Sequence, residues 1–308
     1  MKRLFIATLV VVAFGACKNE NKKVDNATAN ITPPITVAPP TERIEIADAK
    51  NKLAAAETQT RAGNLEETQY IEVIALLTKG IEKNPNAADA YALRAWANFR
   101  LNKNTTALQD FNKALAIDPK TVPALTGRGS LYEAEGKFTD ALSDYNMAIS
   151  ILPSDAATFN NRGSLKRKMN MTDGAIADFT QAISISSSET MFYINRGNAY
   201  VETKRYEDAK NDYENAISLN SQFAPAYAGR ANIHYQLGDF KKAIADYDMA
   251  IKLQPNNADT WRNRGYNKFK LGQSEAALTD INKALDLKND DKLAMQFKEE
   301  VASKRNNM

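Results

Sequence analysis

The sequence has almost none of the residues from which most protein metal sites and many catalytic sites are built. Its 308 residues include one cysteine, Cys17, and one histidine, His234. A single cysteine excludes an intramolecular disulfide framework and any cysteine-rich zinc or iron–sulfur site. A single histidine excludes a multi-histidine metal site, and a Ser-His triad would have to use His234. We therefore predict no metal, no cofactor and no catalytic residue.

Net charge is also lacking in the body of the chain. Lys and Arg number 40 against 37 Asp and Glu, and the first 43 residues carry the whole excess of +3. Residues 44–308 are therefore neutral overall and lack the basic field that nucleic-acid binding generally needs. No glycine-rich phosphate loop occurs either, so we expect no nucleic-acid partner.

The longest uncharged run near the N-terminus, residues 4–16, is too short to cross a membrane. It follows two basic residues, and a spanning helix needs about 20 apolar residues. It fits the hydrophobic region of a secretory signal. Its end, Phe-Gly-Ala-Cys at 14–17, resembles a bacterial lipobox with Phe14 in place of the usual leucine. We predict a signal peptide over 1–16 and a lipidated Cys17. The alternatives are an ordinary signal peptide with a chance cysteine, or an unprocessed N-terminal anchor.

Residues 17–43 have the composition of a tether. They show no apolar periodicity and contain two Pro-Pro pairs among Asn, Thr and Ala. Such a segment cannot bury a core. Two acyl chains on Cys17 would anchor the chain stably to a membrane. We therefore predict a protein of the bacterial cell envelope, lipid-anchored at the outer membrane and facing the periplasm or the surface.

The rest of the sequence repeats with a period of 34 residues. Alanine, arginine and aspartate each recur six times with this spacing and in one phase. The alanines are Ala107, Ala141, Ala175, Ala209, Ala243 and Ala277. Three independent series over six copies without a gap indicate internal repetition.

Each repeat has the pattern of two helices. We number the places of each repeat from its first residue, and the repeats begin at Ala88, Val122, Ala156, Thr190, Ala224 and Ala258. Place 8 is always Gly or Ala, which allows two helices to approach closely. Places 20, 24 and 27 share one helical face because they follow i, i+4, i+7 spacing. Proline near the end of several repeats stops the second helix.

These residues resemble the tetratricopeptide repeat (TPR), a helix–turn–helix unit of 34 residues. The resemblance covers repeats 88–121, 122–155, 156–189, 190–223, 224–257 and 258–289. Residues 44–87 resemble a degenerate earlier hairpin, and residues 290–308 resemble a capping helix with a polar outer face. The resemblance implies an all-α fold, a right-handed superhelical α-solenoid.

Arginine at place 7 departs from the commonest TPR pattern, which has an apolar residue there. The arginines are Arg94, Arg128, Arg162, Arg196, Arg230 and Arg264, and the aspartates at place 23 are Asp110, Asp144, Asp178, Asp212, Asp246 and Asp280. A buried guanidinium needs a carboxylate partner. That partner is the aspartate of the same repeat or of the preceding one. We favour the preceding repeat, as in Asp110–Arg128, because this pairing would set the angle between hairpins.

In TPR proteins, places 2, 5, 6, 9, 12 and 13 line a concave groove. Carried over by place, this implies a groove with asparagines at its centre and aromatic residues at its ends. The expected binding residues are Asn161, Asn195, Asn198, Asn232, Asn263, Tyr235 and Phe269. An Asn amide can donate to and accept from a peptide backbone at once, similar to the asparagine ladder of O-linked N-acetylglucosamine transferase. Alternatively, the asparagines serve solubility and the aromatics pack against terminal hairpins. His234, at place 11, is expected to be a core imidazole.

Two functions follow from this resemblance. One is a non-catalytic interaction scaffold, lipid-anchored in the envelope, that binds an extended peptide or partner protein in its groove. The other is an assembly factor for an envelope machine such as a pilus or secretion system. The sequence does not identify the partner.

Overall fold

The computed structural model describes residues 44–61 and 67–306, so Cys17 and the predicted tether lie outside the described residues. Every regular element within these ranges is an α-helix, which confirms the all-α prediction. The helices are α2 Ile44–Arg61, α3 Glu67–Lys83, α4 Ala88–Arg100, α5 Asn104–Ile117, α6 Val122–Ala134, α7 Phe138–Ile151, α8 Ala156–Lys168, α9 Thr172–Ile185, α10 Thr190–Glu202, α11 Tyr206–Leu219, α12 Ala224–Gln236, α13 Phe240–Leu253, α14 Ala258–Lys270, α15 Ser274–Leu287 and α16 Lys292–Asn306.

A left-handed residue at place 15 turns the chain between the two helices of each repeat. Three of these residues are glycines with φ near +80°, such as Gly136 at 76°. The others are Asn102, Asn170 and Lys204, each with φ of 59°. Glycine and asparagine adopt this conformation most readily, and it commonly ends a helix. The sequence therefore marks most of these turns.

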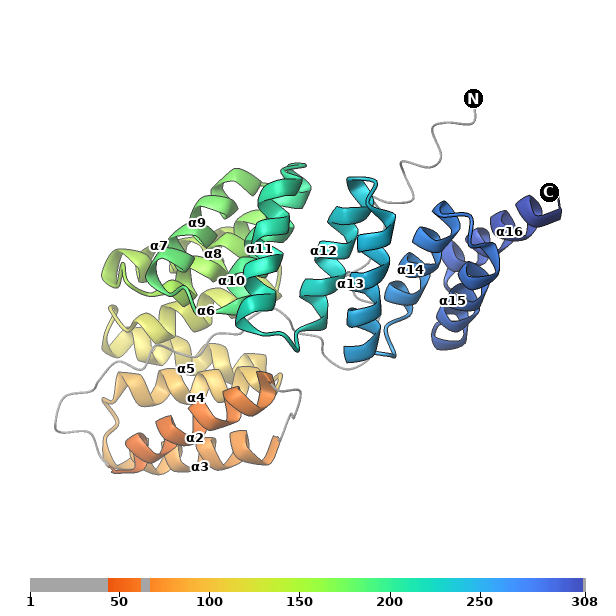
Figure 1. Ribbon diagram of the computed structural model, residues 1–308. Coiled ribbons are helices and arrows are strands. Elements are labelled where there is room, and N and C mark those ends of the chain that lie inside the picture. The colour runs from red at the N-terminus through yellow and green to blue at the C-terminus, as the bar shows by residue number, and fades with distance from the viewer. Residues whose placement is uncertain (1–43, 62–66, 307–308) are drawn as a thin grey trace. The chain divides into compact units, whose positions relative to one another are not determined.

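The chain divides into two compact units, and the boundary falls within α10. Among the described residues, the N-terminal unit extends to Asn195 and the C-terminal unit begins at Arg196. In the N-terminal unit the hairpins α2–α3, α4–α5, α6–α7 and α8–α9 stack in chain order, with α4, α6 and α8 as neighbours (Figure 1). In the C-terminal unit, α12–α13 and α14–α15 form hairpins, and α16 packs on α15 and α14. Each unit is thus a stack of the expected TPR hairpins.

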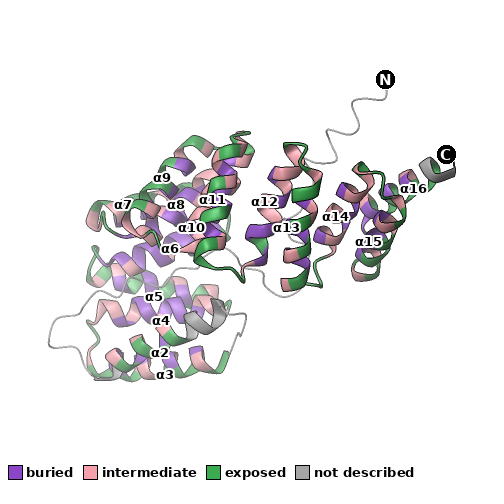
Figure 2. Ribbon diagram, viewed as in Figure 1, coloured by how far each residue is buried: buried purple, intermediate pink, exposed green. Residues whose placement is uncertain are grey.

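The aromatic residue at place 24 forms the centre of the packing between hairpins. Phe111 and Tyr145 are fully buried, and the buried faces of the helices turn toward their neighbours (Figure 2). A Cβ on Gly129 would lie 2.9 Å from the Tyr145 ring in the same repeat. A Cβ on Gly127 would lie 2.4 Å from the Phe111 ring in the preceding repeat. Glycine at places 6 and 8 of the second repeat therefore allows the Phe111 and Tyr145 rings to pack directly against α6.

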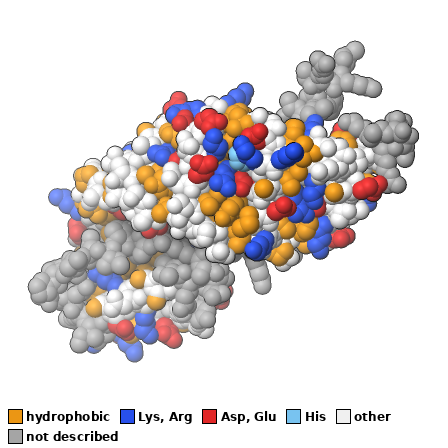
Figure 3. Space-filling view, in the orientation of Figure 1, with side chains coloured by type: hydrophobic (Ala, Val, Ile, Leu, Met, Phe, Trp, Pro, Cys, Tyr) orange, Lys and Arg blue, Asp and Glu red, His pale blue; other side chains and the backbone are white. Residues whose placement is uncertain are grey.

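The described surface matches the neutral composition. Figure 3 shows Lys and Arg side chains interspersed with Asp and Glu on the face in view. Within residues 44–61 and 67–306, none of the helices has the length and apolar character required to cross a membrane. In the same ranges, no group of three or more His, Cys, Asp or Glu side chains is placed to hold a metal ion.

Candidate functional site

Each arginine at place 7 pairs with the aspartate of its own repeat. Arg128 donates from Nε to Asp144 Oδ2 and from Nη2 to Asp144 Oδ1, both at 2.8 Å. The pairs are Arg94–Asp110, Arg128–Asp144, Arg162–Asp178, Arg196–Asp212, Arg230–Asp246 and Arg264–Asp280. Two parallel bonds of this kind are among the strongest hydrogen-bonded ion pairs. The pairing that we favoured from the sequence, with the aspartate of the preceding repeat, is therefore wrong.

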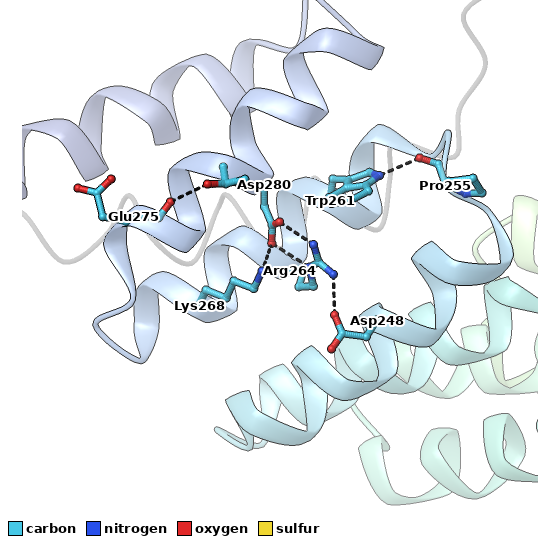
Figure 4. A network of polar contacts seen from close by, with 8 residues as sticks. Asp248, Pro255, Trp261, Arg264, Lys268, Glu275 and Asp280 are labelled. Atoms are coloured by element: carbon cyan, nitrogen blue, oxygen red, sulfur yellow. Dashed lines mark hydrogen bonds and ion pairs between the residues drawn. The ribbon is translucent and has the colours of Figure 1, made fainter.

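The arginine nevertheless contacts the preceding repeat through its third nitrogen. Arg128 Nη1 donates to Asn112 Oδ1 at 2.8 Å, and Arg264 Nη1 donates to Asp248 Oδ1 at 2.6 Å (Figure 4). Both acceptors occupy place 25, two residues after the aspartate that we expected. The guanidinium fork faces the second helix of its own hairpin, so only Nη1 remains for the neighbour.

The surroundings of the guanidinium are those of a structural group. The Arg264 guanidinium carbon lies 4.6 Å from the Trp261 ring centroid, within cation–π range. The hydrogen bonds to Asp144 raise the pKa of Arg128, so this side chain stays charged. Burial raises the pKa of the Asp212 carboxyl, and the Arg196 guanidinium opposes this shift. Because its N–H donors are engaged, the guanidinium group has the role of joining helices rather than binding a substrate.

Place 11 supplies a second cation to the aspartate in some repeats. Lys166 Nζ lies 2.8 Å from Asp178 Oδ2, and Lys268 Nζ lies 2.8 Å from Asp280 Oδ2. His234 takes this place in the fifth repeat, with Nε2 3.8 Å from Asp246 Oδ2 and a side chain only 12% exposed. Burial lowers the pKa of His234, so the imidazole is neutral at pH 7.

Two of the predicted groove asparagines are held by tyrosines at place 24. Tyr213 donates its hydroxyl to Asn198 Oδ1 at 2.8 Å, and Tyr247 donates to Asn232 Oδ1 at 2.5 Å. The amide oxygen of each asparagine is thus engaged within its own repeat. Sequence reasoning missed this contact, although tyrosine at place 24 always coincides with Ser or Asn at place 9.

The asparagines at place 6 are not equivalent. Asn195 donates from Nδ2 to Asn160 Oδ1 at 2.8 Å. Asn161 is buried, and its Nδ2 has no hydrogen-bond partner among the described residues. Asn263 hydrogen-bonds the Tyr247 side chain. Asn161 and Asn195 therefore have different surroundings, and a peptide-binding role for them remains a prediction.

The aromatic residues of the C-terminal unit pack against the capping helix. Phe269 makes a T-shaped contact with Phe297 of α16, with ring centroids 5.5 Å apart. Tyr235 makes a similar contact with Tyr266 at 5.6 Å, and Tyr266 in turn contacts Phe297. These residues therefore have a packing role, and a binding role for Tyr235 and Phe269 remains a prediction.

Family models identify the chain as a repeat protein. Models described as tetratricopeptide repeat match residues 74–122, 156–189, 224–257 and 258–291, and one described as TPR repeat matches 197–238. Together they cover more than half of the chain, so the chain belongs to the TPR family. Members of this family are generally non-catalytic scaffolds for protein–protein interaction, and their stacked repeats form extended concave binding surfaces.

Solved structures share the fold at low identity. YrrB, described as a TPR protein with an unusual peptide-binding site, is 21% identical, with a TM-score of 0.53 over 61% of this chain and 97% of YrrB. PilF of Pseudomonas aeruginosa is 19% identical, with a TM-score of 0.63 over 70% of this chain and 97% of PilF. A TPR protein from Parabacteroides merdae is 19% identical, with a TM-score of 0.54 over 83% of this chain and 99% of that protein.

Proposed function

We propose that this protein is a non-catalytic scaffold that binds an extended segment of a partner along the first helices of its repeats. The observation that carries the proposal is the orientation of Asn198 and Asn232. Their amide oxygens accept from Tyr213 and Tyr247, so both amide nitrogens are directed away from the same internal contact. The two nitrogens repeat with the period of the hairpins, and they match the repeating carbonyl oxygens of a peptide backbone.

Several such contacts would act together. One hydrogen bond contributes about 0.5–1.5 kcal/mol net, so binding needs a series of donors along the surface. The peptide-binding site described for YrrB offers a precedent on the same fold.

The double variant Asn198→Ser and Asn232→Ser tests this role. Serine at place 9 keeps a partner for the tyrosine, as in the Ser130–Tyr145 contact of 3.0 Å in the second repeat, and it removes the amide nitrogen. We expect the variant to keep its melting temperature and to lose partner capture from envelope extracts. Asn215→Ser, on an exposed position of α11, is the matched control.

The alternative function predicts a different result. An assembly factor for a pilus or secretion system would use other helix surfaces structurally. The double variant would then capture its partners at the wild-type level, and the backbone-binding role would be wrong.

We also propose that Cys17 carries the lipid anchor and that the protein resides in the bacterial cell envelope. The lipobox-like segment and the tether composition support this proposal. Mass spectrometry of the mature protein should show loss of residues 1–16 and an added acyl mass on Cys17. A Cys17→Ser protein that stays in the membrane fraction would contradict it.

A further inference from the structure

The hydroxyl of Tyr247 lies between two asparagines of neighbouring repeats in the C-terminal unit. Tyr247, on α13, is 1% exposed, and it donates its hydroxyl to Asn232 Oδ1 on α12 at 2.5 Å. Asn263, on α14, hydrogen-bonds the same hydroxyl. Burial raises the pKa of Tyr247, so the hydroxyl keeps its proton at pH 7. That single proton is directed at Asn232, so the hydroxyl oxygen can only accept from Asn263, which donates through Nδ2.

The tyrosine therefore orients the two amides in opposite senses. Asn232 has its oxygen engaged and keeps Nδ2 as a donor, whereas Asn263 has its nitrogen engaged and keeps Oδ1 as an acceptor. Among the described residues, no hydrogen bond uses Asn232 Nδ2 or Asn263 Oδ1, and neither is a buried atom without a partner. Both asparagines are partly exposed. One donor and one acceptor are thus accessible on the two sides of one hydroxyl.

The ring pair next to the two amides shows that α12 and α14 meet along this face. Tyr235 and Tyr266 follow Asn232 and Asn263 by three residues, one helical turn further along each helix. Their rings make a T-shaped contact, with centroids 5.6 Å apart. Side chains of the two helices therefore meet at two successive turns, first through the amides that Tyr247 bridges and then through the rings.

This combination of residues occurs at one junction of the array. It requires tyrosine at place 24, asparagine at place 9 of the same repeat and asparagine at place 6 of the next repeat. Tyr213 also holds an asparagine, Asn198, but place 6 of the next repeat is Gly229, which has no side-chain amide. Tyr145 donates to Glu133, and place 9 of that repeat is a serine. Only the junction between repeats 5 and 6 supplies both amides.

We propose that Asn232, Tyr247 and Asn263 form an amide clamp that holds the C=O and the N–H of a single residue of the extended partner segment. In an extended chain the two groups of one residue point to the same side. The carbonyl oxygen accepts from Asn232 Nδ2, and the N–H donates to Asn263 Oδ1. Tyr247 is a positioning residue, because it determines which end of each amide faces the partner.

The amide clamp rests on the proposed groove function and adds a requirement to it. Asn198 and Asn232 as donors need only carbonyl groups, which every residue of a partner offers. Asn263 as an acceptor needs a backbone N–H, which proline lacks. The residue held between repeats 5 and 6 is therefore any residue except proline.

The experiment compares two immobilised pools of random nine-residue chains. One pool consists of peptides, and in the other an ester oxygen replaces every backbone N–H, so the carbonyl groups remain and the donors are removed. Binding of the fluorescently labelled protein to each pool gives a ratio of peptide to ester binding. We expect a ratio of at least about fivefold for the wild type. Tyr247→Phe and Asn263→Ala should each lower it by at least about threefold.

The two variants are independent tests. Phenylalanine already occupies place 24 as Phe111 and Phe179, so Tyr247→Phe keeps the buried ring and removes the hydroxyl. Asn263→Ala changes a partly exposed residue, leaves the hydrogen bond from Tyr247 to Asn232 in place and removes the acceptor. The melting temperature of each variant reports whether the C-terminal unit is intact.

Tyr213→Phe is the matched control. It removes the same hydroxyl in repeat 4, where the proposed contact of Asn198 is with carbonyl groups, and both pools contain these. It should therefore keep the wild-type ratio. Equal binding of both pools by the wild type, or a ratio unchanged by Tyr247→Phe or by Asn263→Ala, would overturn the amide clamp while leaving groove binding in place. Binding of neither pool would overturn the amide clamp together with the proposed function.

Discussion

The polar contacts of α6 in the N-terminal unit and the aromatic cluster of Tyr266, Phe269 and Phe297 in the C-terminal unit use the same places of the repeat in opposite ways. Glu133 and Phe269 both occupy place 12, and Ser130 and Tyr266 both occupy place 9. In α6 the residues at these places contact Lys168 and Tyr145, which are polar partners. In α14 the residues at the same places contact the ring of Phe297.

The difference shows that the place in the repeat determines where a side chain points, whereas the residues packed against that side chain determine whether it is part of the core or of a polar contact. At the end of the array, α16 supplies an apolar face, so aromatic residues become core. Inside the array, Tyr145 of the same repeat and Lys168 of the next first helix supply polar groups, so the same places form hydrogen bonds and an ion pair. A list of groove places therefore overestimates the binding surface near α16.

The largest effect is expected where the aromatic cluster around Phe297 is disrupted. Phe297→Ala should destabilise the C-terminal unit by about 3–5 kcal/mol, because it removes a buried ring from contact with Tyr266 and Phe269. Urea unfolding together with amide hydrogen exchange in α16 measures the loss. Met295→Ala, at an exposed position of the same helix, is the control, and an equal loss there would contradict the packing role.

The Arg–Asp ion pairs should contribute alike in both units, because they do not depend on whether the neighbouring helix is polar or apolar. In a double-mutant cycle with alanine, Arg128 and Asp144 should show a coupling of about 1–3 kcal/mol, and Arg230–Asp246 a similar value. Asp144 and Arg162, the pairing rejected by the structure, should couple by less than about 0.5 kcal/mol. A larger coupling for Asp144–Arg162 would restore the pairing between repeats.

A smaller effect of opposite sign is expected at Asn161 in α8. Asn161→Leu should stabilise the N-terminal unit by about 1 kcal/mol, because it removes a buried donor that has no acceptor among the described residues. Leucine already fills this place in the first repeat, as Leu93. Asn195→Leu should instead destabilise, because Asn195 donates to Asn160. Urea midpoints of the two variants give the signs, and destabilisation by both would indicate that Asn161 is satisfied in solution.

The smallest effect is the pH response of His234. Burial lowers its pKa in the folded protein, while the unfolded chain titrates near 6.5. The contribution of His234 to stability should therefore be constant above about pH 6.5 and should become unfavourable below it, because the unfolded state takes up the proton first. His234→Lys, which places at this position the residue found as Lys166 and Lys268 in other repeats, should lose this part of the pH dependence. Urea midpoints of both proteins at pH 7.5 and 5.5 test the difference. An identical change in midpoint between the two pH values for both proteins would contradict it.

Much of the fold follows from local patterns in the sequence. The first helices begin at the residues where the repeats were placed, and Gly or Asn at place 15 marks most of the turns. The candidate site was less predictable. The sequence shows that Tyr213 occurs with Asn198 and Tyr247 with Asn232. It does not show that a side chain at place 24 contacts one at place 9, which is what makes these pairs significant.

The sequence by itself determined the helical hairpins, their period and the residues at each place, because helix periodicity and turn conformations depend on nearby residues. Only the tertiary structure decided which aspartate meets each arginine. Arg128 lies 18 residues after Asp110 and 16 before Asp144, so spacing could not separate the two partners. The crossing of the helices turns the guanidinium fork toward Asp144. The same applies to Asn161 and Asn195, whose different burial arises from contacts between helices that no single repeat contains.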